Sequence, residues 1–227
     1  MHLTIGNRVY SSWSLRPWIL MRVKDIPFQD TVVPLRQPDS AERLRAASPT
    51  SKVPCLVDGD VTVWETLAIM EYLAEKYPAK GIWPHDGRAR AHARASASEM
   101  HGGFPLLRKH YPMTVTQRFK AKPVVPEAQP DIERIVAVWH EARAVFGVRG
   151  EGPFLYGVFT AADAMYVPVA TRFRTYGIPL DPVAQGYVNA VLALPAYQEW
   201  LRAATAEPWM IEQNGLETVI EDLRAKA

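Results

Sequence analysis

The sequence predicts a small α/β domain with a mixed four-stranded sheet, followed by an all-helical domain. Two observations carry this prediction. Strand-like and helix-like segments alternate over residues 1–78, whereas residues 87–227 show mainly helical periodicity. The stretch between them, residues 79–86, contains Gly and Pro and is typical of a linker.

The first domain opens with a short strand at 2–6 and a helix at 15–25 whose apolar residues recur at helical spacing. Pro17 falls in the first turn of that helix, where a missing N–H does no harm. Residues 29–35 are extended again, and residues 39–47 form a short helix that begins at a capping Asp or Ser.

The rest of this domain is a hairpin and a helix. Residues 53–64 indicate two strands around the tight turn Asp58-Gly59-Asp60, and residues 65–78 form an amphipathic helix that ends at a proline. The order is therefore β-α-β-α-β-β-α. Its strand–helix–strand unit predicts a parallel pair with a right-handed crossover, to which the hairpin adds antiparallel strands.

The second domain is predicted as a set of helices joined by loops. Residues 111–130 are Pro-rich and indicate a loop, and residues 216–227 indicate a short amphipathic helix. Thr160 and Asp163 have the spacing of a capping box, and Gly157 just upstream can adopt a positive φ. The helices are expected at about 87–109, 131–147, 161–176, 183–193 and 196–206.

Composition narrows the class of protein. An apolar content of 48% is ordinary for a globular protein, no apolar stretch has the roughly 20 residues of a membrane span, and the first residues lack the pattern of a secretory signal. We therefore expect a cytoplasmic location. The net charge of +2 gives no electrostatic case for a nucleic-acid partner. Cys55 is the only cysteine, which excludes an intrachain disulfide, and we expect it in the core.

Two stretches carry polar residues at helix starts. Ser11, Ser12 and Ser14 surround the start of the first helix, and Glu65-Thr66 opens the last helix of the first domain. Capping explains both stretches, because Ser and acidic residues suit a first helical turn. A second reading is that hydroxyls and free N–H groups face an anion, since a helix N-terminus is a ready anion site. The six histidines show no metal spacing, so no metal site is expected.

Four motifs in register resemble the glutathione S-transferases, and most closely their serine-type zeta class. They are SSWSLR (11–16), SKVPCL (51–56), WETLAIMEYLAEKYP (64–78) and FLYGVFTAADAMYVPV (154–169). Zeta enzymes pattern as Ser-Ser-Cys-Ser, Gln-Val-Pro-Thr-Leu and Gln-Ser-Leu-Ala-Ile. The chain departs from them at Trp13, where they have Cys, and at Glu65, where they have Gln. The resemblance covers nearly the whole chain and implies a thioredoxin-like glutathione-binding domain (1–78) before the helical domain (87–227).

The resemblance implies a catalytic serine that stabilises the thiolate of glutathione. Only the thiolate attacks, and an unperturbed cysteine thiol has a pKa of about 8.5, so the site must favour S⁻ near pH 7. Ser11 matches the catalytic position, five residues ahead of Arg16. Ser12 is the alternative, because its hydroxyl or N–H can share the role. Ser14 is interpreted as an N-cap or first-turn residue.

The resemblance also implies the glutathione-binding residues. A cis bond between Val53 and Pro54 would let the Val53 backbone pair with the cysteinyl segment of glutathione like an added strand. Lys52 would contact the glycyl carboxylate, although an exposed loop lysine needs no such role. Thr66 would bind the γ-glutamyl carboxylate and Glu65 its ammonium group, and this role is compatible with capping.

The resemblance also implies a second pocket, for the electrophile, at Trp13, His101, Phe104 and Arg108, while an ordinary helix-surface role is equally open for the last three. The function expected is conjugation of the glutathione thiolate to small hydrophobic electrophiles, typical of a detoxifying, metal-free homodimer. One alternative is glutathione-dependent cis–trans isomerisation of an unsaturated diacid of the maleylacetoacetate or maleylpyruvate type, with Arg108 or Arg172 holding carboxylates. The other is a non-catalytic interaction domain of the same fold.

Overall fold

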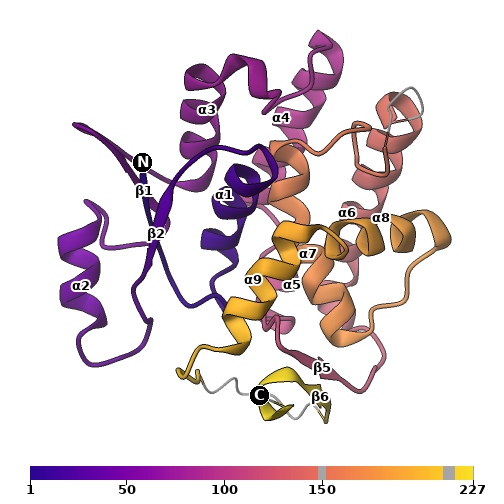
Figure 1. Cartoon of the computed structure of the whole chain (residues 1–227). Coiled ribbons are helices and arrows are strands. Elements are labelled where there is room, and N and C mark those ends of the chain that lie inside the picture. Colours follow the sequence, from indigo (N-terminus) through magenta and orange to yellow (C-terminus); the bar gives the residue numbers. More distant parts are fainter. Residues whose placement is uncertain (148–151, 212–217, 227) are drawn as a thin grey trace.

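The computed structural model describes residues 1–147, 152–211 and 218–226. Its N-terminal part has the predicted order of elements, and Figure 1 shows it beside a larger helical part. The predicted fold class is confirmed. The residue boundaries of the two domains stay a prediction. The elements of the N-terminal part are β1 (His2–Ile5), α1 (Ser12–Val23), β2 (Gln29–Val32), α2 (Ser40–Ala47), β3 (Cys55–Asp58), β4 (Val61–Trp64) and α3 (Thr66–Lys76).

These strands form one mixed sheet in the order β2-β1-β3-β4. Strand β1 runs parallel to β2, with Leu3 opposite Asp30, and antiparallel to β3, with Leu3 opposite Leu56. Leu3 and Leu56 are fully buried, because the sheet is covered by helices. Helices α1 and α3 lie together against one face, and α2 lies on the other side (Figure 1).

The helical part is built around α7, almost every residue of which is buried. Helix α7 packs against α1 of the N-terminal part and against α4 and α8. The capping box that starts it is confirmed, since Thr160 and Asp163 exchange hydrogen bonds, and Gly157 has a φ of 89°. Its helices are α4 (Gly87–Gly102), α5 (Pro105–His110), α6 (Gln129–Ala142), α7 (Ala161–Tyr176), α8 (Pro182–Leu192) and α9 (Pro195–Thr205).

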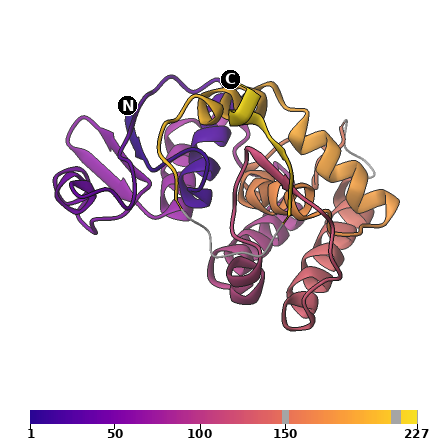
Figure 2. The same cartoon turned by 90° about the horizontal axis from the view of Figure 1, so that it is seen from below.

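The N-terminal and helical parts share one continuous core. Figure 2 shows the same two parts seen from below. Trp200 of α9 is fully buried and donates its indole N–H to the Arg8 carbonyl at 2.9 Å, while its ring lies 5.0 Å from that of Trp18. Arg16 of α1 donates its Nε–H to the carbonyl of Met165 in α7. The sheet and the helices are therefore held in a fixed relation.

Four predicted helices differ from the structure. The helix expected at 15–25 begins at Ser12, so Pro17 lies inside α1 and not in its first turn. The helix expected at 87–109 is broken after α4, because Phe104 has a φ of 59° and Pro105 begins a new helix. The helix expected at 131–147 begins two residues earlier, and its last residues, Arg143–Gly147, form a π-helical turn. Of the expected helix at 216–227, the described residues form instead a strand, β6 (Val219–Asp222), and a 3₁₀ turn, Leu223–Lys226.

Strand β6 also corrects the prediction that residues 111–130 form a loop. The stretch 111–130 is not wholly a loop, because β5 (Gln117–Phe119) pairs antiparallel with β6, with Gln117 opposite Asp222. In residues 219–222, pairing with a strand about a hundred residues away overrides the local helical pattern. Sequence periodicity cannot predict a pairing of this kind, because the partner is distant in the sequence. The stretch also holds a 3₁₀ turn, Pro126–Ala128.

Candidate functional site

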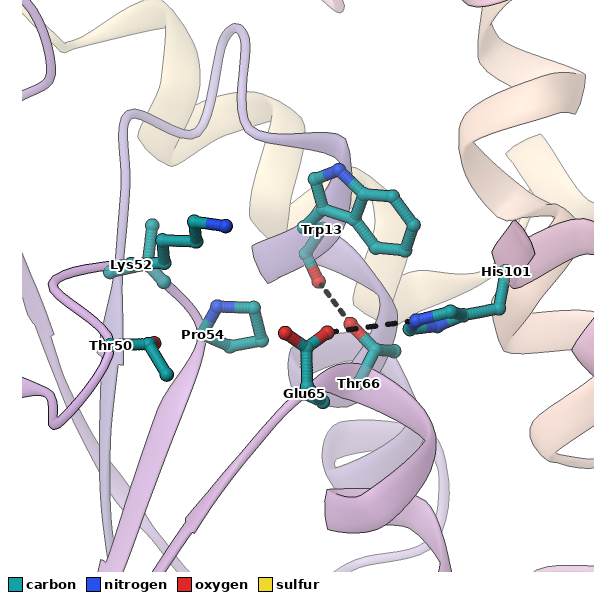
Figure 3. A pocket seen from close by; sticks show the side chains of 8 residues that line it. Trp13, Thr50, Lys52, Pro54, Glu65, Thr66 and His101 are labelled. Carbon is teal, nitrogen blue, oxygen red and sulfur yellow. Dashed lines mark hydrogen bonds and ion pairs between the residues drawn. The ribbon is translucent and has the colours of Figure 1, made fainter. Parts of the chain in front are cut away.

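A cavity of about 240 Å³ lies where α1, α3 and α4 meet the loop before β3 (Figure 3). It opens at the N-terminal ends of α1 and α3, where the first backbone N–H groups of a helix have no partner within the helix. All five expected glutathione-binding residues, Lys52, Val53, Pro54, Glu65 and Thr66, line this cavity together with Trp13. The full lining is Trp13, Thr50, Lys52, Val53, Pro54, Glu65, Thr66 and His101.

The loop before β3 forms one wall. The Val53–Pro54 peptide bond is cis, as the resemblance implied, and Cys55 follows it as the first residue of β3. Cys55 is fully buried, and burial raises the pKa of its thiol above the ordinary value, so it is a core residue as expected. Lys52 is exposed, and Figure 3 shows its side chain extending over the cavity.

Glu65 and Thr66 form the opposite wall, at the start of α3. Glu65 adopts a φ of 65°, a left-handed conformation that few non-glycine residues take, and its side chain makes no capping hydrogen bond. Its carboxylate is therefore directed into the cavity instead of onto the helix (Figure 3). Thr66 is buried and donates its hydroxyl to the Trp13 carbonyl at 3.4 Å, which ties α3 to α1.

The serines at the start of α1 lie just outside the cavity lining. Ser11 is the N-cap: its Oγ accepts from the Ser14 N–H at 3.4 Å and donates to the Ser14 Oγ at 2.8 Å. Ser14 is thus a first-turn residue, and its Oγ also accepts the Gly6 N–H at 3.0 Å. Ser12 is the first helical residue, and none of the hydrogen bonds among the described residues uses its hydroxyl. Capping therefore accounts for the Ser11 contacts seen here.

The residues expected in the electrophile pocket divide into two pairs. Trp13 and His101 line the cavity itself, and their rings meet edge to face with centroids 5.0 Å apart. Phe104 is buried, and Arg108 lies behind Trp13, with its guanidinium carbon 5.1 Å from the centroid of that ring. Arg108 also donates to the backbone carbonyls of Met100 and His101.

Three arginines, Arg16, Arg108 and Arg172, form an arginine cluster beside the site. Arg108 and Arg172 were expected from the sequence as alternative partners of substrate carboxylates, and the structure adds Arg16 to them. The guanidinium carbon of Arg16 lies 4.2 Å from the Trp13 ring centroid, and its Nη1 and Nη2 have no hydrogen-bond partner among the described residues. Burial, and then the charges of Arg172 and Arg108, hold the pKa of Arg16 well below its ordinary value. Burial likewise lowers the pKa of Arg172 to about 10. No pattern in the sequence indicated that Arg16 would be buried without an ion pair among the described residues.

His101 titrates in this cationic setting. Burial is the main cause that lowers its pKa, the charges of Arg16 and Arg108 add to it, and the Glu65 carboxylate opposes it. Its Nε2 lies 3.6 Å from the Glu65 carboxylate. Among the described residues no group of three His, Cys, Asp or Glu side chains is placed to hold a metal ion.

The sheet order and the helical part define a protein with a thioredoxin-like domain attached to a helical domain. Residues 10–76 match the family model described as "Glutathione S-transferase, N-terminal domain". This segment is accordingly similar to the N-terminal domain of the glutathione S-transferases.

Individual relatives agree with this assignment. A probable maleylacetoacetate isomerase of Caenorhabditis elegans is 38% identical over 92 residues, which is 38% of this chain and 42% of the relative. The chain thus matches less than half the length of that curated relative. A glutathione transferase homologue from Burkholderia, solved with bound glutathione, is 23% identical with a TM-score of 0.67, covering 91% of this chain and 98% of its own.

A bacterial zeta-class maleyl pyruvate isomerase has the same fold. It is 23% identical with a TM-score of 0.65, and the match covers 93% of this chain and 100% of that one. At these identities the two solved structures establish the shared architecture. No helix among the described residues has the length and apolar character to cross a membrane.

Proposed function

We propose that this protein is a glutathione transferase that joins the glutathione thiolate to small hydrophobic electrophiles. The observation that carries the proposal is the convergence of Lys52, Val53, Pro54, Glu65 and Thr66 on one cavity at the N-terminus of α3. These residues come from separate stretches of the sequence. Their side chains offer a cation at one end and a carboxylate with a hydroxyl at the other, which suits a zwitterionic tripeptide.

Each part of glutathione then has a partner in the cavity. Lys52 pairs with the glycyl carboxylate, and the Val53 backbone pairs with the cysteinyl segment. Glu65 accepts from the γ-glutamyl ammonium group. The Thr66 N–H, and its hydroxyl once it turns from the Trp13 carbonyl, donate to the γ-glutamyl carboxylate, which the positive end of the α3 dipole also favours.

The sulfur is proposed to lie at the start of α1. There the hydroxyl of Ser11, or that of Ser12, donates a hydrogen bond to the thiolate, and the helix dipole stabilises the negative charge. The thiolate attacks an electrophilic carbon, the leaving group departs with the bonding electrons, and the thiol proton is lost to solvent. The electrophile is proposed to lie against Trp13, with Phe104 and Arg108 behind it. Glutathione is a substrate here, and no metal is invoked.

Cellular context is part of the proposal. The family resemblance supports a cytoplasmic homodimer with a role in detoxification. Size-exclusion chromatography with light scattering would test the dimer directly, since a monomer at micromolar concentration contradicts it.

Two measurements test the proposed activity. Calorimetric titration with glutathione should show binding at a single site per chain, and a chlorodinitrobenzene-type aryl halide should be conjugated at a rate above the uncatalysed one. Failure to bind glutathione at millimolar concentration would overturn the assignment. Binding without turnover of any aryl or alkyl halide would favour instead a non-catalytic domain of the same fold.

The arginine cluster favours one second candidate, cis–trans isomerisation of a small unsaturated diacid. In that reaction the thiolate adds to the double bond, rotation follows, and the thiolate leaves again, so glutathione is regenerated. Arg108, Arg172 or the Arg16 Nη atoms, which have no hydrogen-bond partner among the described residues, would attract a substrate carboxylate. Absence of conversion of maleylacetone in the presence of glutathione would dispose of this candidate.

A further inference from the structure

His101 occupies a distinctive place in the cavity. Of the lining residues, seven come from positions 13–66 and His101 alone comes from the helical part, at the C-terminal end of α4. Figure 3 shows its ring reaching across from α4 toward the start of α3, with Glu65 facing it. The two parts of the chain therefore meet at this pair of side chains.

Neighbouring groups hold the His101 ring in this position. The Trp13 ring packs edge to face against it, and Arg108 donates to the His101 carbonyl at 3.2 Å, which fixes the end of α4. The His101 side chain is 28% exposed, whereas that of Glu65 is 54% exposed. The imidazole is thus the fixed member of the pair, and Glu65 is the member with freedom to turn.

Burial and the charges around the His101 ring decide its protonation state. Glu65 faces it from the cap of α3, Arg16 from α1 and Arg108 from α5. With burial and two guanidinium groups acting against one carboxylate, the neutral form of the ring is favoured. A neutral imidazole protonated on Nε2 donates toward the Glu65 carboxylate without cancelling its charge. The present separation of 3.6 Å closes to hydrogen-bond length with a small rotation of Glu65.

We propose that His101 is a positioning residue for glutathione: it orients the Glu65 carboxylate toward the γ-glutamyl ammonium group, so that both parts of the chain build the γ-glutamyl subsite. This inference rests on the proposed function, because it assumes that glutathione occupies the cavity. Its consequence is that His101 contributes to recognition of the ammonium group specifically, and leaves the rest of the tripeptide to other residues.

The test compares two ligands that differ only at that group. Glutathione and its analogue without the α-amino group, glutaryl-cysteinyl-glycine, are titrated calorimetrically into the wild type and into His101→Ala. Loss of a positioned carboxylate should raise the Kd of glutathione about tenfold or more, as expected for one hydrogen bond to a charged group. The Kd of the analogue should change less than about twofold, because it has no ammonium group for Glu65 to meet.

Further variants separate positioning from a general structural effect. His101→Gln retains a donor and should recover most of the glutathione affinity. In Glu65→Gln, adding His101→Ala should cause no further loss, since the two residues act through one contact. His85→Ala, at an exposed histidine ahead of the same helix, is the matched control and should bind both ligands as the wild type does.

The outcomes separate this inference from the proposed function. Equal weakening of both ligands in His101→Ala, or unchanged glutathione binding, overturns the inference and leaves the transferase assignment intact. Failure of the wild-type protein to bind glutathione overturns both. Circular dichroism and the melting temperature of each variant verify that the fold is retained.

Discussion

The hydroxyl of Ser11 donates to the Oγ of Ser14 at 2.8 Å, so the side chain proposed to meet the thiolate is engaged in the first turn of its own helix. The Ser14 Oγ is held in place by the Gly6 N–H. For Ser11 to donate to a sulfur, its hydroxyl hydrogen has to turn away from Ser14, which a hydroxyl rotor does at low cost. Ser12 has no such competing contact among the described residues. The two serines are therefore distinguishable by experiment.

We expect Ser11→Ala to lower kcat at least tenfold with little change in the Kd of glutathione, because the contact is made to the developing thiolate and not to the rest of the tripeptide. Ser12→Ala should have the smaller effect. Steady-state kinetics with an aryl halide measure both. A drop in kcat of less than about threefold for Ser11→Ala, under about 1 kcal/mol, would remove Ser11 from the role and favour Ser12.

Thr66→Val keeps the shape of the side chain and the backbone N–H but removes the hydroxyl that reaches toward Trp13 and the cavity. We expect the Kd of glutathione to rise about tenfold, roughly the value of one hydrogen bond to a carboxylate. Thr62→Val, the same change on the exposed face of β4, serves as the control and should not alter binding. An unchanged Kd in Thr66→Val would show that the backbone N–H binds the ligand without the hydroxyl.

Trp200 joins α9 to the N-terminal part through its hydrogen bond to Arg8 and its contact with Trp18. Trp200→Phe should lower the free energy of unfolding by about 1–2 kcal/mol, because the Arg8 carbonyl loses its donor. Trp200→Ala should cost about 3–5 kcal/mol through the cavity it leaves. Urea denaturation followed by far-ultraviolet circular dichroism measures both. A loss below about 1 kcal/mol in Trp200→Ala would contradict a structural role for this side chain.

Asp163 gives a pH dependence of stability. Burial raises its pKa to about 6, against the hydrogen bonds from Leu155, Thr160 and Tyr187 that favour its ionised form. The native state therefore binds more protons than the unfolded state between about pH 4 and pH 6, and this group's contribution to the free energy of unfolding falls as the pH rises through that window. In Asp163→Asn this part of the slope should vanish. Denaturation curves collected from pH 4 to pH 7 measure it, and parallel profiles for the two proteins would contradict the shift.

Local pattern was sufficient to predict most of the fold. The alternation of strands and helices up to Pro78 and the capping box at Thr160 and Asp163 are properties of adjacent residues, and both are confirmed. The break at Phe104 and the β5–β6 pair were missed. The break depends on a positive φ at a phenylalanine, and the pair depends on a partner distant in the sequence, so neither leaves a periodic signal.

Only part of the candidate site could be predicted from the sequence, because the rest depends on contacts between elements that are distant in the sequence. Lys52, Val53, Pro54, Glu65 and Thr66 lie in motifs that a family resemblance can identify, and the structure brings them to one cavity. Their roles stay predictions. The grouping of His101 with Glu65 depends on how α4 packs against α3, and the Arg16 Nη atoms without a partner among the described residues depend on how α7 packs against α1. Those contacts between distant elements are set by the tertiary structure, which no short stretch of sequence reports.

The pairing of β5 with β6 has a consequence for how the chain is made. Because Gln117 is matched with Asp222, this ribbon cannot form until residue 222 has left the ribosome, long after α4 to α7 are available to pack. Bringing such distant segments together is slow compared with forming helices from neighbouring residues. The ribbon is thus expected to be a late event in folding, and a nascent chain that stalls before it would display β5 with an open edge.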